Sequence, residues 1–370
     1  MLGPLPDYPW DAMAPYAEEA RAHPDGIVDL SIGSPIDPTP RSIRDALAAA
    51  TDAHAYPTTV GTPRLRSAIS SWFERRRGVA GLAPGEVLPT IGSKELVAWL
   101  PFMLGLGESD AVVHPRAAYP TYAMGAAIAG AQSVPSDDPE EWPSNTKLVW
   151  LNSPGNPDGR VLSIPQLRLA VMRARELGAV IAGDECYAEL GWDAPWVDAP
   201  TPCILDSRVV GQDRSGVLSV YSLSKQSNLA GYRAAFIAGD SLIISRLTTV
   251  RKHVGMILPA PVQEAMVVAL EDDLHVREQK ERYRARRDIL KPALEAAGFT
   301  IDASQAGLYL WATEGRDAWE TIARLARHGI LAGPGTFYGD FFPRHVRFSL
   351  TSPDRGIAAA AQRLAQFSST

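Results

Sequence analysis

The segment GVLSVYSLSKQSNLAGYRAAFIAG, residues 216–239, sets the frame for interpreting the rest of the chain. Its apolar ends, at 216–222 and 234–239, have the length and composition of buried strands. Between them, Lys225 lies among hydroxyl side chains, and Arg233 directly precedes the second run. The pattern predicts a polar pocket at the edge of a sheet, although a strand that ends in an ordinary surface turn fits the same residues.

Lys225 is suited to form a Schiff base with pyridoxal 5′-phosphate (PLP). Such a lysine must be a free amine for part of its cycle, which requires a partly dry, cation-rich pocket that lowers its pKa. Ser222 and Ser224 would supply neutral donors, and Arg233 a fixed positive charge, for the phosphate. The competing interpretation leaves Lys225 solvated and Arg233 in a surface ion pair.

Length and charge limit the classes of protein to consider. At roughly 150 residues per domain, 370 residues suggest two or three domains, and a hydrophobic content of 46% is ample for a core. A net charge of −6 and a pI near 5.7 argue against a nucleic-acid partner, which needs a clustered basic surface. We expect the arginine run 75–77 to be the solvated end of a helix.

Cysteine usage and hydropathy predict a cytoplasmic protein. Cys186 and Cys203 form neither a disulfide framework nor a metal-type spacing, and the histidines show no HxxH pattern, so we expect a reducing compartment and no metal. No run approaches the roughly 18 apolar residues of a membrane span. The first residues lack the pattern of a signal peptide.

Between Gly85 and Asp240, short apolar runs alternate with polar loops and helix-like segments, which predicts a parallel sheet of βαβ units. We expect strands at 86–91, 111–115, 147–152, 179–185, 216–222 and 234–239, and helices at 94–105, 121–131 and 164–178. Ligands of such sheets gather at the carboxyl ends of the strands. The polar motifs of the chain follow those ends, which links the predicted fold to the predicted site.

After Gly255 the pattern changes to an α+β layout. Helices are expected at 259–270 and 272–298, strands at 307–312 and 346–351, with a helix between the strands and another at the C-terminus. Residues 1–40 are rich in proline and predict an extended arm, because Pro and Gly interrupt helices and strands. We divide the chain into an arm, 1–35, that joins the smaller domain, a large domain, 36–255, and a small domain, 256–370.

Asp184 and Tyr187, in the motif DECY, suit the ring of the cofactor. A carboxylate beside the pyridine nitrogen keeps that nitrogen protonated, so the ring can accept electrons. Tyr187 would donate to the phenolic oxygen of the ring, as would Asn156 in the loop after strand 147–152. Each also has an ordinary interpretation, as an acidic strand end, a packed tyrosine and a turn residue.

A second group of residues would complete the cofactor site. The turn Gly92, Ser93 and Lys94 begins a helix and would direct backbone N–H groups toward a phosphate, although a plain helix cap needs no ligand. Tyr119, in HPRAAYPTY, would stack on the ring or simply pack in the core.

Together these motifs resemble the class I/II aminotransferases of PLP fold type I, over nearly the whole chain. The matching patterns are SxSK followed by GxR, DExY and NPxG. The resemblance implies an α/β fold, in which a mostly parallel seven-stranded sheet covered by helices carries a smaller α+β domain. It also implies that Lys225 is the catalytic residue and that Asp184, Tyr187, Asn156 and Arg233 contact PLP.

The resemblance assigns further residues that no local pattern indicates. Tyr56, in YPTTVGTPRLR, matches a tyrosine that reaches the phosphate of the neighbouring subunit, which implies a homodimer with shared active sites. Arg347, in HVRFSL, matches the arginine whose fork binds the substrate α-carboxylate. Gly33, in LSIGSPID, matches the backbone that closes over the substrate. Lys94 and Arg116 depart from the usual residues of the family and are candidates for contacts with a multiply charged substrate, or are solvated loop charges.

As a whole, the sequence is most similar to actinobacterial N-succinyldiaminopimelate aminotransferases of lysine biosynthesis. We therefore expect amino transfer between glutamate and N-succinyl-2-amino-6-oxopimelate. The alternatives are an aminotransferase for aspartate, alanine or aromatic substrates, and a PLP-dependent carbon–sulfur β-lyase, which would use the same cofactor residues. A PLP-sensing transcription regulator would need a DNA-binding domain that residues 1–40 are too short to form. The loop GPGTFYG, 333–339, lacks the GxGxxG spacing of a dinucleotide site.

Overall fold

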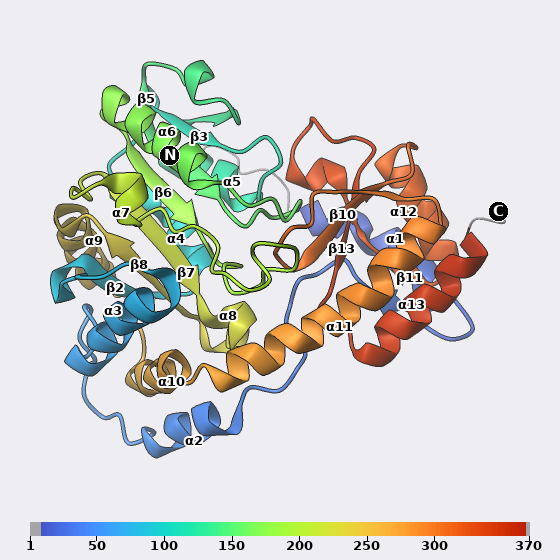
Figure 1. Ribbon diagram of the computed structural model, residues 1–370, viewed down its shortest axis with the longest axis horizontal. Coiled ribbons are helices and arrows are strands. Elements are labelled where there is room, and N and C mark those ends of the chain that lie inside the picture. The colour runs from blue at the N-terminus through green and yellow to red at the C-terminus, as the bar shows by residue number, and fades with distance from the viewer. Residues whose placement is uncertain (1–8, 368–370) are drawn as a thin grey trace.

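A seven-stranded sheet dominates the structure, a computed structural model that describes residues 9–367 (Figure 1). In spatial order its strands are β2 (Val87–Ile91), β8 (Ala234–Gly239), β7 (Val217–Ser222), β6 (Val180–Asp184), β5 (Thr146–Asn152), β3 (Ala111–His114) and β4 (Gln132–Pro135). The five strands from β7 to β4 are parallel, and β8 is antiparallel to both of its neighbours. The mostly parallel seven-stranded sheet is thus confirmed. Sequence reasoning missed β4, because QSVP is short and mostly exposed.

Helices cover both faces of this sheet. Successive residues of each strand point to opposite faces, so one strand contributes side chains to two cores. Leu148 and Trp150 of β5 enter one core, whereas Val149 enters the other. The first core receives α4 (Ser93–Met103), α5 (Thr121–Ala129) and α9 (Ser241–Val254). The second receives α2 (Arg41–Ala49), α3 (Pro63–Arg77), α6 (Ile164–Leu177), α7 (Ser207–Val210) and α10 (Ala260–Glu271).

A smaller antiparallel sheet lies at the other end of α11 (Leu274–Ala296), the long helix that links the two regions in Figure 1. Its strand order is β12 (Gly333–Pro334), β13 (Val346–Ser349), β10 (Tyr309–Thr313) and β9 (Thr300–Asp302). Two further helices, α12 (Ala318–Arg327) and α13 (Asp354–Phe367), pack in the same core. The expected α+β pattern is present, and our division of the chain into domains stays a prediction.

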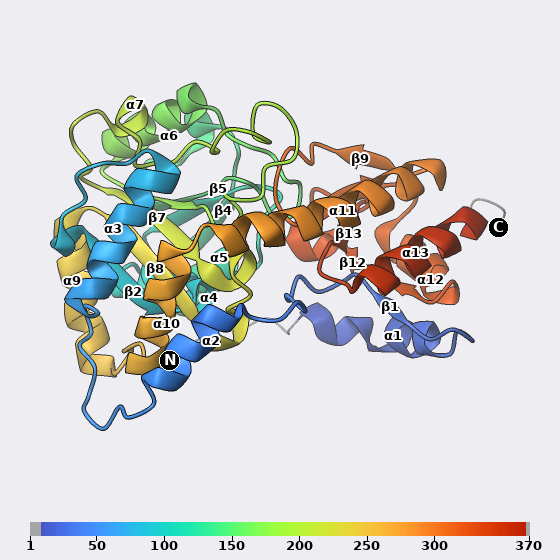
Figure 2. The same cartoon turned by 60° about the horizontal axis from the view of Figure 1, so that its bottom comes forward.

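The amino-terminal region is not the extended arm that its prolines predicted. It forms the 3-10 turn η1 (Pro9–Met13) and the helix α1 (Ala14–Arg21), because Pro15 falls in the first turn, where a helix tolerates proline. The following β1 (Val28–Asp29) pairs in parallel with β11 (Ile330–Leu331), which places this region against α12 and α13 (Figure 2). The part of the arm before residue 9 lies outside the described residues.

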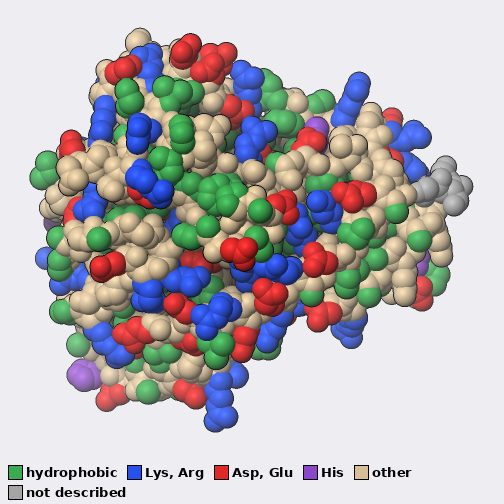
Figure 3. Space-filling model, viewed as in Figure 1, with side chains coloured by type: hydrophobic (Ala, Val, Ile, Leu, Met, Phe, Trp, Pro, Cys, Tyr) green, Lys and Arg blue, Asp and Glu red, His purple; other side chains and the backbone are tan. Residues whose placement is uncertain are grey.

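Short helices complete the chain. These are α8 (Leu223–Gln226), η2 (Pro84–Glu86), η3 (Pro139–Glu141), η4 (Ala230–Tyr232) and η5 (Gly335–Tyr338). Within residues 9–367, no helix has the length and apolar character needed to cross a membrane. On the face drawn in Figure 3, basic and acidic side chains are interspersed, so this face carries no continuous basic stripe.

The arginine run 75–77 is not the solvated helix end that its charge predicted. Arg77 is buried, and its guanidinium lies 3.1 Å from the carboxylate of Glu185, which is also buried. Arg76 pairs with Glu189, and Arg75 lies 3.1 Å from Asp273. The end of α3 packs against the chain that follows β6, and this contact replaces solvent.

Removing the Arg77 side chain should be far more costly than removing Arg75. Arg77→Ala leaves the Glu185 carboxylate buried without its cation, and loss of one member of a buried ion pair costs about 3–5 kcal/mol. Arg75→Ala, the matched control on the same helix, removes a half-exposed pair and should cost about 1 kcal/mol or less. Urea denaturation of both variants measures the difference; equal costs would contradict the structural importance of the buried pair.

Candidate active site

Most of the polar residues predicted to bind a cofactor come together at one edge of the large sheet. Asp184 and Ser222 are the last residues of β6 and β7. Gly92 follows β2, and Asn156 lies in the loop after β5. Arg233 precedes β8, whose antiparallel direction brings its amino end to the same edge. The ends of β2, β5, β6 and β7 and the start of the antiparallel β8 therefore bring these residues to the same edge of the sheet.

Lys225 lies on the one-turn helix α8, which directly follows β7 in the sequence. The Ser222 hydroxyl accepts from the amide of Ser224 at 3.2 Å and donates to its hydroxyl at 2.8 Å, which fixes the start of this turn. The Lys225 amine donates to the carbonyl of Gly33. Burial lowers the pKa of Lys225, and the positive charges of Arg347 and Arg233 lower it further against the opposing effect of Tyr309. The amine is therefore neutral at a lower pH than a solvated lysine.

A cradle suited to a phosphate lies beside Lys225. Gly92 has a φ of +78°, and a Cβ added there would lie 2.2 Å from an Nη atom of Arg233, so only glycine allows this approach. Ser93 and Lys94 follow as the first residues of α4, where amide groups have no partner within the helix. The guanidinium and the helix start therefore face the same small space, as the phosphate of PLP would require.

Asp184 is a buried carboxylate held by a residue that sequence reasoning missed. Its Oδ2 accepts from the Tyr122 hydroxyl at 2.8 Å, and its Oδ1 accepts from the amide of Cys186 at 3.3 Å. Burial raises the pKa of Asp184. Tyr122 stacks on Trp150 of β5, with 5.2 Å between ring centroids. The available signal was a second tyrosine one helical turn after Tyr119.

Arg347 is buried on β13 and joins three segments of the chain. Its guanidinium donates to Oδ1 of Asn156 at 2.9 Å and to the carbonyl of Ser31 at 2.7 Å. It also lies over the ring of Tyr309, with 3.8 Å between the guanidinium carbon and the ring centroid. Its Nε is buried and has no hydrogen-bond partner among the described residues. The predicted carboxylate-binding arginine thus lies next to a predicted cofactor-binding residue.

Tyr309 of β10 was not predicted to have a role, yet it contacts several of the predicted residues. Its hydroxyl lies 3.3 Å from the hydroxyl of Tyr187. A Cβ on Gly33 would lie 2.0 Å from the same hydroxyl, which explains why glycine stands there. Burial raises the pKa of Tyr187. Burial alone would also raise the pKa of Tyr309, but the charges of Arg347 and Lys225 lower it below its ordinary value.

Four predicted residues lie farther from this group or make other contacts. Tyr56 is 98% exposed in the single chain. Arg116 pairs with Glu141 at 3.0 Å and lies over the ring of Phe341. Lys94 has an exposed side chain, and Tyr119 packs edge-on against Tyr122. The roles of these residues stay predictions.

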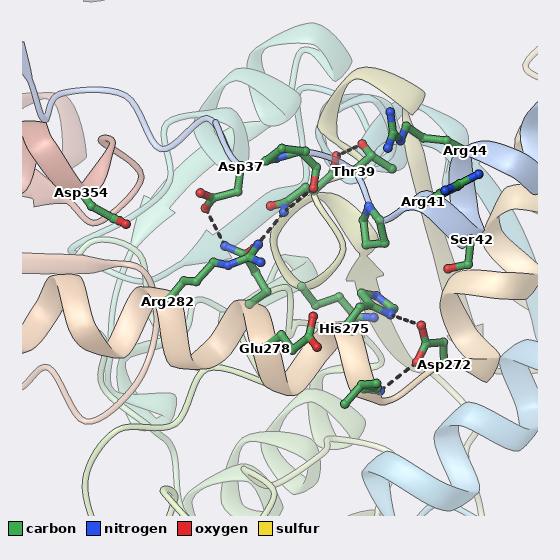
Figure 4. A pocket seen from close by; sticks show the side chains of 16 residues that line it. Asp37, Thr39, Arg41, Ser42, Arg44, Asp272, His275, Glu278, Arg282 and Asp354 are labelled. Atoms are coloured by element: carbon green, nitrogen blue, oxygen red, sulfur yellow. Dashed lines mark hydrogen bonds and ion pairs between the residues drawn. The ribbon is translucent and has the colours of Figure 1, made fainter.

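A separate cavity of about 530 Å³ adjoins α8 (Figure 4). It is lined by the 37–44 segment, by Gln226 and Asn228, and by the start of α11, but not by Lys225. Figure 4 shows His275 directed toward Asp272; their side chains are 3.1 Å apart. The hollow is thus distinct from the residues that surround the Lys225 amine.

Comparison with known sequences agrees with this geometry. Residues 25–364 match the family model of aminotransferase class I and II. The chain is 54% identical to the 4-dedimethylamino-4-oxo-anhydrotetracycline transaminase OxyQ of Streptomyces rimosus, over 97% of this chain and 99% of that protein. It is 52% identical to the probable aminotransferase Rv1178 of Mycobacterium tuberculosis, over 97% of this chain and 85% of that protein.

Solved structures give the same result. A probable N-succinyldiaminopimelate aminotransferase from Thermus thermophilus superposes with a TM-score of 0.88 at 28% identity, over 97% of this chain and 100% of that one. A single mutant of the Thermus thermophilus aspartate aminotransferase superposes with a TM-score of 0.87 at 25% identity, over 98% of this chain and 97% of that one. The chain belongs to the class I and II aminotransferases, which depend on pyridoxal 5′-phosphate.

Proposed function

We propose that this aminotransferase works at the edge of the sheet described above, with Lys225 as its catalytic residue. The observation that carries the assignment is that two side chains bind backbone carbonyls of the same short segment, 31–33. The Lys225 amine binds the carbonyl of Gly33, and the Arg347 guanidinium binds the carbonyl of Ser31. The groups that would meet the substrate's Cα and its carboxylate are therefore neighbours.

The residues divide the work by charge and proton affinity. PLP, when bound, supplies an aldehyde that links to amines and a ring that accepts electrons from the neighbouring carbon. Arg347 would bind the α-carboxylate and so orient Cα. Lys225, whose pKa is lowered by burial, would take the proton from Cα and deliver it to the former aldehyde carbon of the cofactor, as amino transfer requires. Asp184, fixed by Tyr122, would keep the ring nitrogen protonated.

For the substrates, our first candidate is transfer between glutamate and N-succinyl-2-amino-6-oxopimelate, in the cytoplasm. The superposition on the Thermus thermophilus protein of that description supports this candidate. The 54% identity to OxyQ supports a second candidate, an oxo substrate of the kind for which that transaminase is named. Both candidates require a protein that accepts an amino group from a donor and passes it to an oxo group.

A panel of substrates should separate these candidates from each other and from β-lyase chemistry. Glutamate should shift the absorbance band of the bound cofactor to that of its pyridoxamine form. N-succinyl-2-amino-6-oxopimelate should restore the original band faster than pyruvate, oxaloacetate or an oxo-anhydrotetracycline. Cystathionine should release no pyruvate. Faster restoration by the tetracycline would reverse our order of candidates, and pyruvate release without amino transfer would refute the proposed reaction.

Replacing Lys225 tests the assignment of the catalytic residue. Lys225→Ala should abolish the cofactor band that native protein shows and should reduce turnover by at least about 10³-fold, because the general base and the covalent anchor are both lost. Absorbance spectra and steady-state rates measure both effects. Lys291, a lysine of α11 that is not one of the residues described at this site, provides the control variant Lys291→Ala, which should keep the band. A native band that persists in Lys225→Ala would contradict the assignment.

We also propose that Tyr56 acts in the site of a neighbouring subunit of a homodimer. Its place in the motif YPTTVGTPRLR supports this, and its 98% exposure in the single chain leaves the side chain accessible to a second subunit. Lys225→Ala and Tyr56→Ala should each be impaired alone. Unfolding and refolding them together should restore about a quarter of native activity, since half of the dimers would be hybrids with one intact site. No recovery in a mixture with demonstrated hybrid dimers would contradict a shared site.

A further inference from the structure

We propose that Tyr309 is a positioning residue that ties the carboxylate-binding end of the active site to its cofactor-binding end. Its ring supports the guanidinium of Arg347, and its hydroxyl holds the hydroxyl of Tyr187. The inference rests on the proposed roles of Lys225, Tyr187 and Arg347.

The backbone fixes Tyr309 against Arg347. In the antiparallel pair β10–β13, Trp311 lies opposite Arg347 and Tyr309 opposite Ser349. Side chains two residues apart on a strand share a face, so Tyr309 is a diagonal neighbour of Arg347, within reach of a long side chain. The ring centroid lies 3.8 Å from the guanidinium carbon, a cation–π contact in a buried setting.

The hydroxyl of Tyr309 is fixed by different groups. It lies 3.3 Å from the Tyr187 hydroxyl, and the two rings meet edge-on at 5.7 Å. The Cα of Gly33 approaches so closely that a methyl group there would overlap the hydroxyl. Because the carbonyl of Gly33 accepts from the Lys225 amine, this one phenol reaches the surroundings of the lysine as well.

The surroundings of Tyr309 and Tyr187 affect the protonation of the two phenols differently. The charged and titratable groups that face Tyr309 are Lys225, Arg347, Tyr187, Tyr119 and Tyr283. The two cations favour the ionised form of Tyr309, whereas burial keeps Tyr187 protonated. Tyr187 is therefore the phenol that retains its proton. Without cofactor, the Tyr309 oxygen can accept that proton across the 3.3 Å contact; when Tyr187 donates it to a cofactor oxygen, the Tyr309 hydroxyl would instead donate to the Tyr187 oxygen and hold it in place.

Two substitutions separate the functions of the ring and the hydroxyl. Tyr309→Phe keeps the ring and removes the oxygen, whereas Tyr309→Leu removes both. Tyr283→Phe, a buried tyrosine of α11 in the same core, is the matched control. Tyr309→Leu should raise the KM for the amino acid about tenfold through loss of the cation–π contact, and Tyr309→Phe should leave that KM nearly unchanged.

Removing the oxygen should change two titrations. In protein freed of cofactor, the phenolate absorbance that appears at the lowest pH should vanish in Tyr309→Phe and persist in Tyr283→Phe. In loaded protein, the pH midpoint of the cofactor band should fall by about one unit in Tyr309→Phe, because the oxygen that stabilises positive charge at Lys225 is gone. The double variant Tyr187→Phe/Tyr309→Phe should shift the pH midpoint of the cofactor band by less than the sum of the shifts in the two single variants.

Each outcome decides between the proposals. Unchanged titrations in a Tyr309→Phe protein that melts like the native one would overturn the role of Tyr309. A native protein without a Lys225-dependent band would instead overturn the proposed site, while the phenolate titration would still judge Tyr309. If Tyr309→Phe fails to fold, Tyr187→Phe tests the same contact from its other side, and an unmoved phenolate titration there would refute it.

Discussion

The buried guanidinium of Arg347 is the constraint on which the site depends. A buried cation is tolerated only when polar groups surround it. Its partners come from the segment before residue 40, the loop after β5 and two tyrosines of the small-sheet region. The large sheet, the small sheet and the amino-terminal segment must therefore all be in place before this charge is satisfied. The same arrangement brings Asn156 into contact with Arg347 and Gly33 into contact with Lys225.

The reversed strand β8 provides the second constraint. If β8 ran parallel to its neighbours, Arg233 at its start would lie at the far edge of the sheet, away from Lys225. Because β8 is antiparallel, a short turn after α8 is enough to bring Arg233 against Gly92. The separation of Lys225 and Arg233, which lies eight positions later, is thus a consequence of topology as much as of local chemistry.

Sequence reasoning located most of the large sheet and the residues at its edge, because a buried strand is a local apolar run and its polar end stands out. It failed where a role depends on a distant partner. Tyr122 and Tyr309 resemble core aromatics, and their hydroxyl partners lie 62 and 122 positions away. Arg77 resembles a solvated charge for the same reason, since Glu185 follows 108 positions later. The family was recognised from its motifs, but substrate choice depends on contacts that no short motif records.

The hydrogen bonds that Lys225 and Arg347 make to the carbonyls of segment 31–33 have an energetic consequence for binding. Any ligand that uses the amine or the guanidinium must exchange with the protein's own backbone, so its measured affinity is a difference between two sets of contacts. By linkage, the conformational freedom of this segment and the occupancy of the site must influence each other equally. Substitutions in segment 31–33 can therefore change ligand affinity through this exchange, in addition to any direct contact with the ligand. The backbone carbonyls of segment 31–33 therefore compete weakly with any ligand for the Lys225 amine and the Arg347 guanidinium.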